Sequence, residues 1–446
     1  MNAINEIEIK SVSEHGLESR LLAWKALMAW KQGEGFIGEM LGQIALTMKI
    51  SPQDRNLALE IALGVCRQQS LLEHHLKKHL NWSKTDKDLR YLLLVAIYQH
   101  HFLNQIPVYS IVDTAVQLAN NELKGGIRKS GFVNAILRKC TSEKLPTPKT
   151  TSSKTAALRY SHPSWLAHKW VDEVGLQKAC LRMKANNMNP TQWVRVRTDK
   201  ISIKDVASQL LIEEVETRFE TYLQVFKIGE VLKSDLFKNG LISFQDPSSH
   251  LVCLMLKALP GDKVIDLCAA PGGKTAWLLE RGVEVLSCDL KSHRLEQLQD
   301  VKDRLGLNIQ TQTMDLLNPT IEEKSYSHVL LDAPCSNLGV LHRRPEARWN
   351  IEMKDIRATA ELQNRLLESA ATLVAPGGVL VYSTCSPEPE ETILVVEEFL
   401  NNNQDFELEP VRSIVGRRYV QGSYMRIFPA PGSLDGFFGA RLVRQK

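Results

Sequence analysis

Long apolar segments are missing from this chain. None of its apolar runs reaches the roughly 18 residues that a membrane span needs. Its first residues also lack the basic stretch followed by an apolar one that marks a secretory signal. We therefore expect a cytoplasmic protein without a membrane partner.

Closely spaced cysteines are missing as well. No two of the eight cysteines lie within four residues of each other, so paired CxxC zinc or redox motifs are excluded. In a reducing compartment, scattered cysteines are mostly small buried apolar side chains. We accordingly predict no metal site, and we expect packing roles for most of these thiols. The cysteines are Cys66, Cys140, Cys180, Cys253, Cys268, Cys288, Cys335 and Cys385.

No strong excess of one charge is present. The net charge of +4 permits a polyanionic partner without requiring one. With 43% hydrophobic and 24% charged residues, the composition is that of a globular protein, not a disordered or collagen-like one. At 446 residues, the chain is long enough for two to four domains of the usual roughly 100 to 200 residues.

The first part of the chain, from Leu17 to about Lys144, has helical spacing throughout. Ser51-Pro52-Gln53-Asp54 is typical of a helix start, and the segment 91–98 is apolar nearly all round, as a central bundle helix is. The polar, unpatterned segment 145–156 is the best linker candidate.

The end of this helical part is rich in basic residues and also contains an apolar run, 132–137. One face should pack and the other should be basic. The basic face suits contact with RNA phosphates, although a merely solvated helix face explains it equally well. Its basic residues are Lys124, Arg128, Lys129, Arg138, Lys139 and Lys144.

Residues from about 157 to 240 predict a small α+β unit. The segment 193–197 alternates apolar and basic residues, which is typical of a half-exposed strand. We expect Arg195 and Arg197 to be exposed on one face of that strand. The alternative, that this stretch is an extension of the next domain, stays open.

From Lys263 onward, predicted strands and helices alternate. The strands are expected at 263–268, 284–289, 309–314, 328–332 and 379–384, with helices between them. This rhythm predicts a doubly wound parallel sheet, whose ligands bind beyond the carboxyl ends of the strands.

The first of these strands runs into a turn of small residues that leads to a helix. Small side chains let a ligand approach the backbone closely, and a helix start offers unpaired N–H groups. The turn matches neither GxGxxG nor GxxxxGK[ST], which disfavours dinucleotide and P-loop sites. The turn comprises Cys268, Ala269, Ala270, Pro271, Gly272, Gly273, Lys274 and Thr275.

Acids and cysteines follow the later strands. Asp289 ends the second strand, where such folds often place a carboxylate on a ribose, and Asp315 follows the third. Either acid could instead be a cap or turn residue. Two cysteines follow the fourth and fifth strands, in Asp332-Ala333-Pro334-Cys335-Ser336 and Thr384-Cys385-Ser386. A nucleophilic thiolate there would need a nearby cation, for which Lys274 is the candidate.

The segments 266–275, 332–336 and 384–386 together resemble the RNA cytosine-C5 methyltransferases that use S-adenosylmethionine. The helical front part narrows the resemblance to the bacterial family of small-subunit (16S) ribosomal RNA methyltransferases B, whose N-terminal domain is similar to the antitermination factor NusB. The implied fold is α/β: a Rossmann-like methyltransferase domain at 241–446, preceded by an all-helical NusB-like RNA-binding domain at 1–145 and by a linker with a small α+β RNA-binding unit at 146–240.

This resemblance also implies roles for residues. The segment from Cys268 to Lys274 would line the methionine end of the cofactor, Asp289 would hold the ribose, and Asp315 would approach the adenine. Asp332 would face the target cytosine. Cys385 would be the nucleophile that adds to C6 of the base, and Cys335 would assist product release. The implied partner is 16S ribosomal RNA, free or in an early assembly intermediate, and a monomer is the simplest expectation.

The chain departs from the family in one loop. Ser336-Asn337-Leu338-Gly339 stands where Ser-Gly-Thr-Gly or Ser-Ala-Thr-Gly is more usual, and Thr392 stands where Asn often ends the next motif. Near the end, the segment 435–440 resembles the family's closing motif. Arg343, Arg344 and Arg348 could grip RNA phosphates, or they could belong to a solvated loop.

Other functions stay open. The chain could methylate cytosine in transfer RNA or at another ribosomal site. A noncatalytic RNA-binding assembly factor is a further alternative, although a binder needs neither thiol. Methylation of an exocyclic amine is disfavoured, because it would need an Asn/Asp-Pro-Pro-aromatic motif in place of Asp332-Ala333-Pro334-Cys335.

Overall fold

The structure, a computed structural model, describes residues 16–33, 35–212, 219–430 and 434–446. The residues before 16, where we expected no signal peptide, lie outside the described ranges. The chain divides into two units: residues up to Asn187 with Leu341–Asn350, and Met188–Val340 with Ile351–Lys446. Both units share the predicted middle range 146–240, so the division into three domains stays a prediction. None of the described helices has the length and hydropathy of a membrane span.

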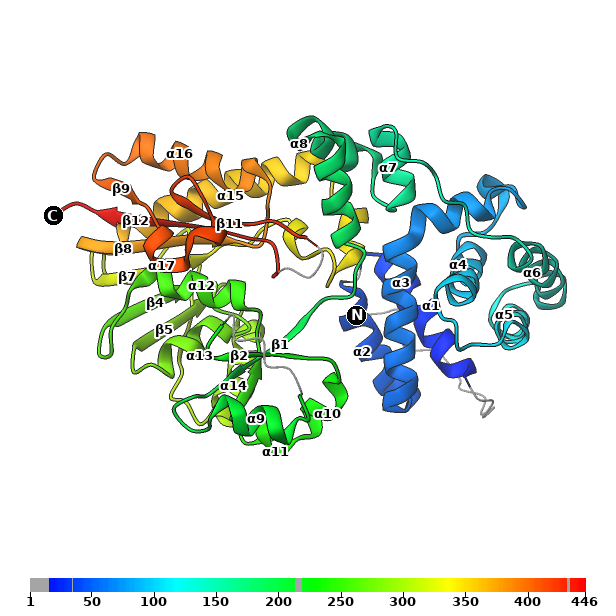
Figure 1. The fold of residues 1–446 in the computed structure, drawn as a ribbon, viewed down its shortest axis with the longest axis horizontal. Coiled ribbons are helices and arrows are strands. Elements are labelled where there is room, and N and C mark those ends of the chain that lie inside the picture. The colour runs from blue at the N-terminus through cyan, green and yellow to red at the C-terminus, as the bar shows by residue number, and fades with distance from the viewer. Residues whose placement is uncertain (1–15, 34, 213–218, 431–433) are drawn as a thin grey trace. The chain divides into compact units, whose positions relative to one another are not determined.

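The first unit is helical, as predicted (Figure 1). Its core helix α4 is buried on nearly every side from Leu89 to Gln99, which matches the all-apolar pattern of its sequence. Ser51 caps α3 by accepting a hydrogen bond from the Asp54 backbone N–H at 3.1 Å. The helices around this core are α1 (Leu17–Lys31), α2 (Ile37–Met48), α3 (Pro52–Leu76), α4 (Lys87–Phe102), α5 (Val108–Glu122) and α6 (Gly126–Thr141).

Helix α6 has the two faces that the sequence predicts. Val133, Ile136 and Leu137 are buried in the helical core, whereas the basic residues Arg128 and Arg138 are exposed. The helical period of 3.6 residues thus places the buried apolar residues on one side of α6 and the basic residues on the other.

The rest of this unit contains α7 (Ser153–Arg159), α8 (Ser164–Ala185) and the segment Leu341–Asn350. Arg348 of that segment is fully buried, and its guanidinium donates to the backbone oxygens of Ser161 and Asn186 at 3.1 and 3.0 Å. The prediction that Arg348 grips RNA phosphates is therefore wrong, because backbone oxygens of the same unit occupy its donors. Arg344 is exposed, with its guanidinium 4.1 Å from the centre of the Phe36 ring.

The second unit begins at Met188 with an α+β stretch that covers the later part of the predicted range 157–240. Three antiparallel strands lie in the order β2-β1-β3, with three short helices in the same stretch. The strands are β1 (Gln192–Val196), β2 (Tyr222–Val225) and β3 (Ile242–Phe244), and the helices are α9 (Ile203–Gln209), α10 (Ile228–Lys233) and α11 (Asp235–Lys238).

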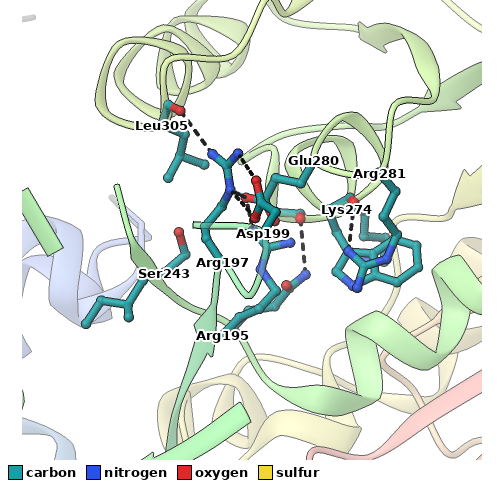
Figure 2. Close-up of polar contacts among 12 residues, drawn as sticks. Arg195, Arg197, Asp199, Ser243, Lys274, Glu280, Arg281 and Leu305 are labelled. Carbon is teal, nitrogen blue, oxygen red and sulfur yellow. Dashed lines mark hydrogen bonds and ion pairs between the residues drawn. The ribbon is translucent and has the colours of Figure 1, made fainter. Parts of the chain in front are cut away.

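The predicted exposure of Arg195 and Arg197 is wrong. Only 3% of Arg195 and 7% of Arg197 is exposed. Figure 2 shows Arg195 directed at Glu280, to which it donates at 2.8 Å, while Arg197 bonds Asp199 at 2.9 Å and the Leu305 carbonyl at 3.2 Å. The reason is that β1 is covered on both faces: Trp193 packs in one core cluster, and Val194 in another. The alternation of apolar and basic residues along β1 therefore separates two buried faces, and one of these faces holds the Arg195–Glu280 ion pair.

The large sheet has the order β10-β11-β12-β8-β7-β4-β5-β6 among the described residues, with β9 beside β12. Neighbours from β8 to β6 are parallel, and β12 joins β8 antiparallel. The strands are β4 (Lys263–Leu267), β5 (Glu284–Asp289), β6 (Gln310–Thr313), β7 (Tyr326–Asp332), β8 (Val374–Thr384), β9 (Phe406–Glu409), β10 (Val420–Gln421), β11 (Tyr424–Ile427) and β12 (Phe437–Arg444).

Helices cover both faces of this sheet, which confirms the Rossmann-like prediction (Figure 1). Val329 and Leu331 of β7 pack with the helices α15 and α16, while Leu330 between them packs with α12 and α13. The chain order reverses between β4 and β7, which is where such sheets bind ligands. The helices are α12 (Pro247–Leu256), α13 (Gly273–Leu279), α14 (Ser292–Leu305), α15 (Met353–Thr372), α16 (Ile393–Asn402) and α17 (Arg412–Val415).

The buried ion pair of β1 generates a stability prediction. Glu280→Ala leaves the guanidinium of Arg195 buried without its carboxylate, which should lower the free energy of unfolding by about 3–5 kcal/mol. Lys227→Ala is the control, because it breaks an exposed pair and should cost less than about 1 kcal/mol. Urea unfolding followed by circular dichroism measures both. Equal losses in the two variants would contradict this account of β1.

Candidate active site

The turn after β4 holds its shape through backbone contacts. The N–H groups of Cys268 and Ala269 both donate to the Cys288 carbonyl, at 3.0 and 2.9 Å, which ties the turn to β5. Gly272 has a φ of 97°, and a Cβ there would lie 2.9 Å from Cγ of Leu298. Only glycine fits this position without a shift of α14. Ala269 and Ala270 are buried beside it, so the turn presents mostly backbone.

Asp289 lies at the end of β5 with only 2% of its side chain exposed. Its Oδ1 accepts hydrogen bonds from Nη1 of Arg294 at 3.3 Å and from the Lys291 N–H at 3.4 Å. Oδ2 lies 3.3 Å from the same Nη1 but accepts no hydrogen bond. A buried carboxylate oxygen without a donor is costly, and a ligand hydroxyl would satisfy it.

Asp315 lies after β6 and is exposed. Its Oδ1 accepts from the Leu317 N–H at 3.0 Å, and its Oδ2 accepts from Nδ2 of Asn318 at 3.2 Å. The carboxylate therefore caps its own turn, the role that sequence reasoning kept as the alternative to ligand binding.

Asp332 connects three strand ends. Nζ of Lys274 donates to its Oδ2 at 2.5 Å, and Oγ of Ser383 donates to its Oδ1 at 2.8 Å. Burial disfavours the charge on Lys274, but the Asp332 carboxylate outweighs it and raises the pKa of Lys274. The cation predicted to serve the cysteines is thus paired with Asp332, and the pair carries a proton at the ligand edge of the sheet.

The two predicted cysteines come together. The Sγ atoms of Cys335 and Cys385 lie 3.1 Å apart. The thiol of Cys385 donates to Oδ1 of Asn337 at 3.2 Å, which leaves its sulfur able to accept a hydrogen bond from Cys335. This hydrogen bond to Cys385, together with burial, raises the pKa of Cys335 well above its usual value. Cys335 is therefore suited to remain a thiol.

Asn337 is one of the two residues, with Leu338, by which this loop departs from the resembled family. It has a φ of 60°, a conformation that asparagine tolerates better than most residues. Its Nδ2 donates to the Cys335 carbonyl at 3.0 Å, while its Oδ1 accepts from Cys385. One side chain thus contacts both cysteine residues. Asn337 was noted as a departure but was given no role from sequence.

Glu391 is a fully buried acid that sequence reasoning missed as a functional residue. It accepts hydrogen bonds from the Ser336 N–H at 2.7 Å and from the hydroxyls of Ser336 and Ser386 at 2.5 Å each. Burial raises the pKa of Glu391 although these donors favour its charged form. One carboxylate therefore holds the residue that follows each cysteine. The sequence does contain a signal for this role: an acid shortly after the Thr-Cys-Ser motif, and a serine directly after each of the two cysteines.

Backbone contacts complete the site. A Cβ at Gly339 would lie 2.6 Å from the Cys385 carbonyl and 2.5 Å from the Gly436 carbonyl. The Gly339 N–H donates to the Cys385 backbone carbonyl at 2.9 Å, and the Gly436 N–H donates to the Gly339 carbonyl at 3.0 Å. The closing motif thus presses against the cysteine loops from the end of the chain.

Comparisons with known proteins agree with this architecture. The family model described as 16S rRNA methyltransferase RsmB/F matches residues 253–443, that of the NusB family matches 17–142, and a ferredoxin-like domain of RsmF/B-like methyltransferases matches 162–225. The chain is 31% identical to the probable ribosomal RNA small subunit methyltransferase B of Bacillus subtilis, over 94% of this chain and 97% of that protein. It is 33% identical to ribosomal RNA small subunit methyltransferase B of Vibrio cholerae, over 90% and 92%.

Two solved structures are similar as well. The protein PH0851 is 26% identical with a TM-score of 0.79, over 98% of this chain and all of that one. A methyltransferase homologue from Pyrococcus horikoshii is 28% identical with a TM-score of 0.56, over 66% of this chain and all of that one.

Asp266 at the end of β4 generates a pH prediction. Burial raises its pKa to about 6, because only its Oδ2 has a donor, Thr275 at 2.8 Å, while Oδ1 is buried without one. Between about pH 4 and pH 6 the folded protein keeps a proton that the unfolded chain has lost, so the contribution of Asp266 to stability falls as pH rises, by about 3 kcal/mol in all.

Asp266→Asn cannot titrate, so its free energy of unfolding should fall less than that of the wild type between pH 4 and pH 6. Urea unfolding at each pH measures this difference, and Asp300→Asn, an exposed change on α14, is the control. Parallel pH profiles for Asp266→Asn and the wild type would contradict the assignment.

Proposed function

The chain belongs to the 16S rRNA methyltransferase RsmB/F family, and from this premise we propose that it transfers a methyl group from S-adenosylmethionine to C5 of a cytosine in 16S ribosomal RNA. The observation that carries the cytosine-C5 chemistry is the Cys335–Cys385 pair beside Asp332, at the carboxyl ends of neighbouring strands. C5 of cytosine is a poor nucleophile until a thiolate adds to C6. An RNA binder or an amine methyltransferase has no use for two thiols in contact.

The residues around β4 and β5 fit the cofactor. The backbone of the turn 268–274 offers close approach, and the orphaned Oδ2 of Asp289 would accept from a ribose hydroxyl. Asp315, at the next strand end, would approach the adenine amine with its remaining lone pairs. When bound, the cofactor supplies an electrophilic methyl group on a sulfonium.

Cys385 is the proposed nucleophile. Its thiol loses its proton to solvent as the sulfur adds to C6, and this addition makes C5 electron-rich enough to take the methyl group. The adduct is stabilised by a proton or hydrogen bond at N3 of the base, and the Lys274–Asp332 pair holds such a proton. Asp332 would face N3 of the base, and Lys274 would replace the proton that Asp332 gives to N3.

Cys335 is proposed to assist release of the product. After methyl transfer, loss of the C5 proton to solvent water restores the C5–C6 double bond and breaks the bond between C6 and the Cys385 sulfur, while the proton at N3 returns to Asp332. The Cys335 thiol, 3.1 Å from that sulfur, is placed to protonate it as it leaves. The raised pKa of Cys335 keeps this proton in place until it is needed.

The RNA would also contact the helical unit. The exposed basic face of α6 suits phosphate contact, and the NusB family match covers this helix. We infer a monomer that acts in the cytoplasm on 16S ribosomal RNA, free or in an early assembly intermediate. A cytosine in transfer RNA or at another ribosomal site is the alternative substrate.

Substitution of the two cysteines separates their roles. Cys385→Ala should abolish methyl transfer from labelled S-adenosylmethionine to RNA, because no C6 adduct can form. Cys335→Ala should form the adduct but release it slowly, so that a protein–RNA complex survives denaturing electrophoresis. Cys180→Ser, in the helical unit, is the control and should behave as the wild type. Full activity of Cys385→Ala would show that another group is the nucleophile.

The substrate is tested in cells. Bisulfite sequencing of ribosomal and transfer RNA from a strain without this gene should show one cytosine of 16S ribosomal RNA that has lost its methyl group. A site lost in transfer RNA alone would overturn the ribosomal assignment while leaving the cysteine chemistry intact.

A further inference from the structure

A group of three side chains of the types that bind metals lies in the helical unit, whereas the cysteine pair belongs to the second unit. His75, His79 and Cys140 each offer one ligand atom, and these atoms lie within 4.8 Å of one another. His75 is in the last turn of α3, His79 follows one turn later, and Cys140 is in the last turn of α6. Cysteine spacing alone predicted no metal site, because the cysteine lies 65 residues from the first histidine.

His75 and its neighbour His101 each have a buried ring nitrogen without a hydrogen-bond partner. His75 is fully buried, its Nε2 lies 3.2 Å from the Cys140 carbonyl, and its Nδ1 is buried without a hydrogen-bond partner. His101 lies against it, with the ring centres 5.3 Å apart, and its Nε2 is likewise buried without a partner. Two orphaned nitrogens side by side are unusual in a well-packed helical core, where buried polar atoms are normally bonded.

The polar neighbours of His75 and His79 are of the kind found beside metal-binding histidines. A metal-binding histidine usually donates its other ring nitrogen to a carbonyl or carboxylate. The Cys140 carbonyl lies beside Nε2 of His75 in this way, and the Glu143 carboxylate lies 3.2 Å from Nε2 of His79.

Two imidazoles and one thiolate are the ligand types that zinc prefers. Zinc bonds of roughly 2.0 to 2.3 Å require the three ligand atoms to move inward by no more than about 1 Å. Water can supply the fourth ligand. We propose that His75, His79 and Cys140 bind one zinc ion, which links the end of α3 to the end of α6.

The proposal predicts how the full-length protein binds Co²⁺, a spectroscopic substitute for Zn²⁺. After treatment with a chelator, the protein should bind one equivalent of Co²⁺ and develop a thiolate-to-cobalt charge-transfer band, which Zn²⁺ then displaces. Zinc should also raise the melting temperature, because it binds only the folded helical unit.

Variants locate the site. Cys140→Ser should lose the charge-transfer band, and His79→Gln should weaken Co²⁺ binding by about tenfold or more. Cys66→Ser is the matched control. Cys66, in α3, is fully buried like Cys140 but lies outside the group, so the charge-transfer band should persist. His79 is only 12% exposed yet lies beyond the end of α3, so its variant tests the site even if Cys140→Ser fails to fold. A wild-type protein without the band, or an unchanged band and affinity in His79→Gln, would overturn the proposal.

Discussion

The buried carboxylate of Glu391 is the interaction on which the cysteine site depends. It holds Ser336 after one cysteine and Ser386 after the other, so a single charged group sets the distance between two loops that leave different strands. The charge is costly to bury, but it is satisfied by short hydrogen bonds from the backbone and two hydroxyls. With these loops fixed, the sulfurs meet at 3.1 Å and Asn337 bonds one of them. The chemistry proposed for the two thiols needs this fixed separation, because one sulfur must protonate the other.

The parallel sheet provides the frame for this interaction. Its strands β4, β7 and β8 are neighbours and end at the same edge, so residues far apart in sequence become partners there. Asp332 receives Lys274 from the turn after β4 and Ser383 from β8. The glycine contacts at Gly339 and Gly436 then bring the end of the chain against the same loops. The topology of the backbone thus positions the residues of the site, and their side chains contribute charge and protons.

Much of this site could be predicted from the sequence, because its signals are local. Short apolar runs placed the parallel strands, and the residues at their ends followed from the rule that such sheets bind ligands there. The predictions that were wrong concerned residues whose surroundings come from segments distant in the sequence. Arg195 alternates with apolar residues, yet both faces of its strand are buried, and Arg348 looked like part of a basic loop but is buried in the helical unit. The role of Glu391 and the grouping of His75 with Cys140 likewise exist only after folding.

The central claim is that Cys385 forms the bond to the base while Cys335 remains a free thiol. RNA that carries 5-fluorocytosine at the target site tests it most directly, because fluorine at C5 cannot leave as a proton does and the adduct is trapped. Tandem mass spectrometry of the digested complex should find the methylated fluorinated nucleotide on the peptide that contains Cys385. Its attachment to Cys335, or methyl transfer without any trapped adduct, would contradict the account.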